Sequence, residues 1–290
     1  MRPSRSLCQS HQHPRKQRAE TNTGTPTEAI GSAPLWANTL RFKLKTATTN
    51  ALTKTVSFAE SASNKLKNCV ALLTIAPVYD PKPINDFLQP ILMVAIVTQM
   101  VANAALAFRT SDIDTILYIA VKRLLQGCIH EDGLADTADS SGRHTKQSKL
   151  TIIKDPKTGV FGTLSLMLLF TTEYVLLKRL NPVKALKTTT ICNLIGYSSM
   201  LWHWTCLPHA YNACELTLRR NNAIACAITV CALLFIYFEL IRAITVIIQI
   251  TTLNIWFNAW SLANLAGRTG DTLGAIKLLS ETLSFVCLSA

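Results

Sequence analysis

Seven apolar stretches, most of them close to the length that crosses a lipid bilayer, constrain the fold of this chain more than any other feature. They cover residues 88–108, 113–129, 160–177, 185–204, 223–238, 241–257 and 273–288. A transmembrane helix needs about 20 predominantly apolar residues, and it satisfies all of its backbone hydrogen bonds within one segment. The stretches therefore predict an all-α, polytopic integral membrane protein.

The scarcity of charge supports this class. Only 16% of the 290 residues are charged, although a soluble domain usually carries about a quarter. Two stretches are imperfect, because Lys122 and Arg123 interrupt the second and Glu173 lies in the third. We therefore expect five to seven spans. The nine cysteines fall mostly in apolar stretches, so we expect reduced packing residues and no disulfide framework.

Residues 1–67 form a tract of different composition, which we expect to be distinct from a transmembrane catalytic domain of residues 68–290. The tract carries eleven basic residues against three acidic ones and is rich in Ser, Thr and Asn. Three interpretations stay open: an organelle transit peptide, a contact with anionic lipid, or a solvated tail, which we favour. The positive-inside rule places this tract in the cytoplasm.

An acidic segment, HEDGLADTAD at residues 130–139, directly follows an apolar stretch and holds four of the 17 acidic residues. Asp132, Asp136 and Asp139 are spaced by four and three, so a helix would present their carboxylates on one face. Such like charges repel each other, and a divalent cation would remove that cost. Mg²⁺ suits oxygen ligands and binds through a few carboxylates together with substrate phosphates. The alternative is a solvated helix start, but acids against a membrane segment favour function.

A basic, glycine-containing segment follows at residues 142–162, with Arg143, Lys154 and Lys157 before Gly159 and Gly162. Cations can neutralise a pyrophosphate, and glycines allow a close approach of the backbone. Basic clusters flank the stretch 160–177 on both sides, which one straight span cannot reconcile with the positive-inside rule. Either that stretch is re-entrant or interfacial, or some cations serve an anionic ligand. We favour the second explanation, in which some of these cations bind an anionic ligand.

A third segment, GRTGDTLGA at residues 267–275, precedes the final apolar stretch. It has the pattern of a turn that starts a helix. Asp271 would either cap that helix or complete the acidic site, and Gly270 precedes it.

The three segments together, in content and in order, resemble the integral-membrane cobalamin synthase family, also called adenosylcobinamide-GDP ribazoletransferases. That family shows the patterns H-x-D-G-L-A-D-x-A-D, K-D-x-x-x-G-x-x-G and T-G-D-x-L-G-A, which stand here at residues 130–139, 154–162 and 269–275. The chain departs from the family after Asp139, where the loop is abbreviated, and in its first third. The resemblance is therefore to a divergent member.

The resemblance implies a Mg²⁺-dependent transfer at a helical membrane site. A hydroxyl of α-ribazole or its 5′-phosphate would attack the cobinamide-linked phosphorus of adenosylcobinamide-GDP, and GMP would leave. The implied metal ligands are Glu131, Asp132, Asp136, Asp139 and Asp271; the implied catalytic residues are His130, Lys154 and Asp155; the implied substrate-binding residues are Arg143, Lys157, Gly159, Gly162 and Gly270. We further expect the bacterial inner membrane, contact with membrane lipid, no nucleic-acid partner, and a chain that is able to form a homo-oligomer.

Two other functions are less consistent with the sequence. CDP-alcohol phosphotransferases show the pattern D-G-x-x-A-R, followed later by G-x-x-x-D-x-x-x-D. Here Ala135 is followed by an aspartate, Asp136, and not by an arginine, and no later pair of aspartates has the second spacing. A small cation transporter predicts acids spread over several spans, whereas only Glu173 and Glu239 are isolated in this way. The sequence contains no P-loop, dinucleotide fingerprint or nucleophile elbow. A zinc site at residues 206–214 lacks a second ligand pair.

Overall fold

The computed structural model describes residues 88–107, 109–211 and 220–290. The basic tract of residues 1–67 and its boundary lie outside the described residues. The described residues form helices joined by short turns, and they contain no β-sheet. The helices are α2 (Leu88–Ala107), α3 (Asp112–Leu125), α4 (Ile129–Ser141), α5 (Lys146–Ile152), α6 (Val160–Arg179), α7 (Pro182–Cys206), α8 (Arg220–Tyr237), α9 (Leu240–Leu265) and α10 (Gly270–Ser289). The predicted all-α class is confirmed.

Three of these helices, α6, α9 and α10, are long and apolar enough to cross a membrane. Two shorter apolar segments, Ala95–Ala107 and Ala223–Tyr237, belong to α2 and α8. On α6 and α9 many large apolar side chains are exposed, as lipid-facing side chains are, for example Val160, Met167, Ile241, Ile248 and Ile255. The chain is a polytopic membrane protein, and the stretch 160–177 forms one uninterrupted helix within it.

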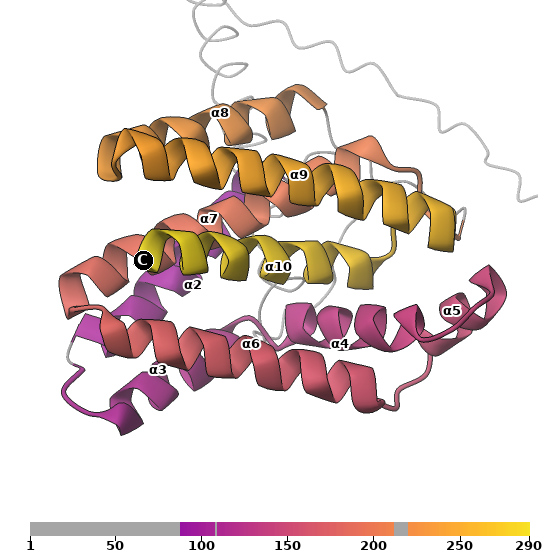
Figure 1. Ribbon diagram of the computed structural model, residues 1–290, viewed down its shortest axis with the longest axis horizontal. Coiled ribbons are helices and arrows are strands. Elements are labelled where there is room, and N and C mark those ends of the chain that lie inside the picture. The colour runs from indigo at the N-terminus through magenta and orange to yellow at the C-terminus, as the bar shows by residue number, and fades with distance from the viewer. Residues whose placement is uncertain (1–87, 108, 212–219) are drawn as a thin grey trace, which may run out of the picture. The chain divides into compact units, whose positions relative to one another are not determined.

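Helix α10 is central among the described helices. In Figure 1 it lies between α9 on one side and α4 and α6 on the other, and it also packs along α7. The buried share of its apolar window is 61%, against 28% for α6 and 22% for α9. Helix α10 is therefore packed against protein on most sides, whereas α6 and α9 turn a broad face outward.

The apolar stretch 113–129 does not form a single helix. Helix α3 ends at Leu125, and Gly127 and Cys128 adopt left-handed conformations with φ of 66° and 55° before α4 begins at Ile129. A glycine in this conformation just beyond the cap residue is a common way to end a helix. The turn separates the acidic segment from the preceding apolar residues and makes it the independent helix α4.

Helices α4 and α10 cross with their backbones almost in contact. A Cβ atom added to Gly133 would lie 2.7 Å from the carbonyl oxygen of Asp271, and one added to Gly274 would lie 3.0 Å from the Cα of His130. Glycine at both positions removes the side chains that would separate the two helices. This crossing fixes the acidic helix beside the N-terminus of α10.

Candidate active site

The predicted acidic face forms on α4 and meets carboxylates from two other segments. The pKa of Asp136 is raised to about 7, first by burial and then by the charges of Asp132, Asp271, Asp139 and Asp155, in that order. Helix α4 is not one of the three apolar spans. The five carboxylates thus share one electrostatic site, at the end of the bundle where α4 ends and α6 and α10 begin, on the right of Figure 1.

Asp139 connects the acidic helix to the start of α6. Its two carboxylate oxygens accept hydrogen bonds from the backbone N–H groups of Gly159 at 2.6 Å and Gly162 at 2.8 Å. These amides belong to the first turn of α6, whose N-cap residue Gly159 provides no side chain of its own. A carboxylate there satisfies unpaired donors and interacts favourably with the helix dipole.

The two glycines are required by this contact. A Cβ atom on Gly159 or Gly162 would lie 2.6 or 2.5 Å from an oxygen of Asp139. Gly159 and Gly162, expected to bind substrate, therefore receive the Asp139 carboxylate in the structure. Asp139, expected to bind metal, already accepts two hydrogen bonds, although a carboxylate offers about four lone-pair positions.

The start of α10 is capped without Asp271. The Thr269 hydroxyl accepts from the backbone N–H of Thr272 at 3.2 Å, and the Thr272 hydroxyl accepts from the backbone N–H of Thr269 at 2.9 Å. Asp271 therefore leaves the capping role to Thr269. A Cβ atom added to Gly270 would meet nothing within 4 Å. The residue before Asp271 therefore borders open space.

The basic residues of the 142–162 segment lie at the surface. Arg143, Lys154 and Lys157 are exposed, and Lys154 Nζ lies 4.2 Å from the centre of the Tyr211 ring, in a cation–π contact. Asp155 is half-buried, and its Oδ1 accepts from the backbone N–H of Lys157 at 3.2 Å. Among the described residues, no carboxylate pairs with Arg143 or Lys157. The acids of this site therefore do not neutralise these cations by ion pairing among the described residues.

A buried ion network lies deeper in the bundle. Its members are three cations and three carboxylates from α3, α4, α6 and α10: Lys122, Arg123, Lys277, Glu131, Glu173 and Glu281. Lys122 Nζ lies 2.8 Å from Glu173 Oε1 and also pairs with Glu281. Arg123 pairs with Glu173 and, at 2.8 Å, with Glu131, while Lys277 pairs with Glu281 at 2.6 Å. The network balances its own charge.

The structure does not bring two of the predicted site residues to the acidic face. Glu131, expected among the metal ligands, pairs with Arg123 in the buried ion network, because it lies about 100° around α4 from Asp132. His130, expected to be catalytic, is 3% exposed, and its Nε2 lies 3.3 Å from the hydroxyl oxygen of Tyr197. Burial lowers the pKa of His130, which favours the neutral ring.

Residue-by-residue reasoning on the sequence missed this network. In the sequence Lys122, Arg123 and Glu173 only interrupt apolar stretches, and Glu131 is a candidate metal ligand. These interrupting charges could have indicated the network, because unpaired charges in apolar segments are costly and opposite charges on different helices tend to pair.

Magnesium chemistry fits the acidic face in part. Among the described residues, no group of three or more His, Cys, Asp or Glu side chains stands ready to hold a metal ion. Mg²⁺, however, usually keeps several waters and binds through one or two carboxylates plus substrate phosphates. The repulsion that raises the pKa of Asp136 is the kind that a bound cation relieves. The donor chemistry suits a metal that arrives together with an anionic substrate.

Comparison with known proteins gives one consistent answer. The family model described as cobalamin-5-phosphate synthase matches residues 65–289. A Sinorhizobium protein named adenosylcobinamide-GDP ribazoletransferase is 28% identical over 206 residues, 66% of this chain and 78% of the relative. The proteins of that name from Rhizobium meliloti and Shewanella piezotolerans are 30% and 26% identical, over 61% and 68% of this chain and 76% and 80% of their own lengths. No solved structure matches the chain.

Proposed function

The chain belongs to the cobalamin-5-phosphate synthase family, and from this membership we propose that it is an adenosylcobinamide-GDP ribazoletransferase. The transfer joins adenosylcobinamide-GDP to α-ribazole or α-ribazole 5′-phosphate. The acceptor hydroxyl oxygen forms a bond to the cobinamide-linked phosphorus, the bond from that phosphorus to the GMP oxygen breaks, and GMP leaves. One observation carries the proposal: carboxylates from three separate segments share one electrostatic site, and the segment that supplies Asp155 exposes cations that form no ion pair among the described residues.

We propose that one or two of Asp132, Asp136 and Asp271 would hold Mg²⁺ together with the substrate phosphates. The three aspartates share the acidic face, and Gly270, the residue before Asp271, borders open space. Bound there, Mg²⁺ would neutralise the charge of the pyrophosphate and the charge that develops during transfer. Asp139 contributes by capping α6. Glu131 is left out of this set because it pairs with Arg123.

The exposed cations would bind the phosphates of the substrate. Arg143 and Lys157 carry charge with no carboxylate partner among the described residues, so an anionic ligand does not have to displace a protein carboxylate from them. Lys154, held against Tyr211, would stabilise the charge on the departing GMP phosphate. Such positioning and charge stabilisation supply most of the catalysis in phosphoryl transfer.

A carboxylate is better placed than a histidine to accept the proton of the attacking hydroxyl. Asp155 is half-buried within electrostatic reach of Asp136, at the edge of the exposed basic segment. His130 is buried and hydrogen-bonded to the Tyr197 hydroxyl. A general base must come within hydrogen-bond distance of the proton that it removes, so we propose Asp155 for this role.

The isolated acids weigh against a cation transporter. Glu173 pairs with Lys122 and Arg123, and Glu239 lies 3.7 Å from Arg242 at the surface. A carboxylate that is already paired offers little to a passing cation. For the proposed transferase we expect the bacterial inner membrane, with the N-terminus in the cytoplasm.

The test is release of GMP from adenosylcobinamide-GDP by membranes that contain the full chain, with α-ribazole 5′-phosphate, in the presence and absence of Mg²⁺. We expect release that needs both metal and acceptor. Asp136→Asn should lower turnover by about 100-fold, as loss of an electrostatic catalytic group does. Asp112→Asn is the matched control, because Asp112 is an exposed aspartate at the start of α3, paired with Lys178. Wild-type turnover in Asp136→Asn would overturn the metal assignment.

A further inference from the structure

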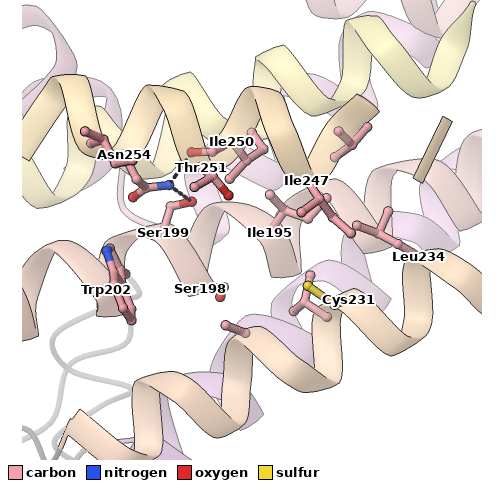
Figure 2. A pocket seen from close by; sticks show the side chains of 14 residues that line it. Ile195, Ser198, Ser199, Trp202, Cys231, Leu234, Ile247, Ile250, Thr251 and Asn254 are labelled. Carbon is pink, nitrogen blue, oxygen red and sulfur yellow. Dashed lines mark hydrogen bonds between the residues drawn. The ribbon is translucent and has the colours of Figure 1, made fainter. Parts of the chain in front are cut away.

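A cavity of about 350 Å³ lies between α7, α8 and α9, separate from the acidic face. Its walls are mostly aliphatic, as Figure 2 shows for Ile195, Leu234, Ile247 and Ile250. This volume is at the lower end of the range for small-molecule sites. No charged side chain is among the described residues that line it. A ligand of this cavity is therefore neutral and mainly hydrocarbon.

One end of the cavity is polar and carries an unused acceptor. Asn254 is 6% exposed, and its side-chain N–H group donates to the Ser199 hydroxyl at 3.0 Å and to the Ile250 carbonyl at 2.8 Å (Figure 2). Its Oδ1 has no hydrogen-bond partner among the described residues. A buried acceptor without a partner costs about 1–3 kcal/mol, which a ligand that brings a donor would recover.

The cavity is reached from the lipid-facing side of the bundle. Ile255 is one of its lining residues and is 65% exposed on α9, one of the three apolar spans. A molecule dissolved in the bilayer therefore has access to the cavity without passing the acidic face. The hydrocarbon chains of bilayer lipids also surround such a helix at high concentration.

From the aliphatic walls, the unused Asn254 acceptor and the lipid-side access, we propose that this cavity binds a lipid alcohol: one hydrocarbon chain among α7, α8 and α9, with its hydroxyl donating to Asn254 Oδ1. A methylene group fills about as much space as a water molecule, ~30 Å³, so the cavity takes a chain of about ten carbons. The proposal does not depend on the transferase activity, because no residue of the acidic face lines the cavity.

Trp202 lines the polar end of the cavity and serves as a reporter. The full chain is placed in nanodiscs of saturated phosphatidylcholine and titrated with 2-bromodecan-1-ol or with 1-bromodecane, whose ten carbons match the cavity and whose bromine, at the head of the chain, quenches a tryptophan close to it. The Trp202→Phe variant gives the signal of the other tryptophans for subtraction. We expect saturable quenching of Trp202, with the alcohol binding about tenfold more tightly than the alkane, as one recovered hydrogen bond predicts.

Two variants separate the acceptor from the volume. Asn254→Leu keeps the size of the side chain and should abolish the preference for the alcohol. Ala227→Phe fills the cavity from α8 and should abolish quenching by both probes, with Ser198→Leu as a second filling variant if the first does not fold. Ile248→Phe is the control, because Ile248 is 60% exposed on α9 and does not line the cavity. Equal affinity for alcohol and alkane in the wild type, or undiminished quenching in a folded filling variant, would overturn the proposal.

Discussion

Removal of Lys122 from the buried ion network should destabilise the protein strongly. Lys122→Met leaves three carboxylates against two cations in an environment that is almost closed to solvent, since Lys122 is 2% exposed and Glu173 is 5% exposed. Breaking a buried ion pair on one side costs about 3–5 kcal/mol, because the remaining charge loses its partner. At about 2–4 °C per kcal/mol for a domain of this size, the melting temperature should fall by about 6–20 °C.

A double variant tests whether uncompensated charge is the cause. Lys122→Met combined with Glu173→Gln leaves two complete pairs, Arg123 with Glu131 and Lys277 with Glu281. We expect the double variant to be at least about 2 kcal/mol more stable than the sum of the single effects, as neighbouring members of one network are not additive.

Thermal unfolding followed with a thiol-reactive dye measures these differences, because Cys192 is 1% exposed and reacts only when the bundle opens. The control is Lys178→Met, which breaks a 2.9 Å pair with Asp112 whose side chains are 45% and 60% exposed. Exposed pairs contribute about 0–1 kcal/mol. The reasoning fails if Lys122→Met shifts the melting temperature no more than Lys178→Met does, or if the two network substitutions are additive.

Three further predictions concern the acidic site. Asp139→Ala removes the acceptor for two amides of α6 and should cost about 0.5–2 kcal/mol, measured by the same thermal assay, with lower turnover because the start of α6 shifts. Gly133→Ala should cost about 1–3 kcal/mol, since its Cβ would lie 2.7 Å from the Asp271 carbonyl oxygen, and an unchanged melting temperature would contradict the close crossing. Gly270→Ala meets open space and should change stability by less than about 0.5 kcal/mol, so a raised KM in this variant would indicate that substrate occupies that space.

Periodicity and length predict most of the described helices, because they are local properties, but they predict neither α5 nor the separation of α3 from α4. Each of the seven apolar stretches corresponds to a helix, and the spacing of Asp132, Asp136 and Asp139 places them on one side of α4. The end of α3 at Leu125 was not predicted. Apolar residues continue to Ile129, and the backbone turn at Gly127 leaves no mark in the hydropathy.

The partners of individual side chains depend on which helices meet, which spacing within one segment does not reveal. Glu131 and Asp132 are adjacent in sequence, yet Glu131 points to Arg123 on α3 and Asp132 to the acidic face. The glycines at 159 and 162 suggested contact with a ligand, but the structure brings Asp139 to their amides. Both differences come from tertiary packing that brings residues from different helices together.

The buried ion network also has a consequence for how the protein is made. Its charges lie on four helices that leave the ribosome at different times, with Lys122 and Arg123 on α3 well before Glu173 on α6 and Glu281 on α10. A charge at the centre of a bilayer costs about 2.5–3.5 kcal/mol on the insertion scale. Helix α3 should therefore stay near the translocon or the lipid headgroups until α6 arrives, and only the synthesis of α10 lets the membrane domain close.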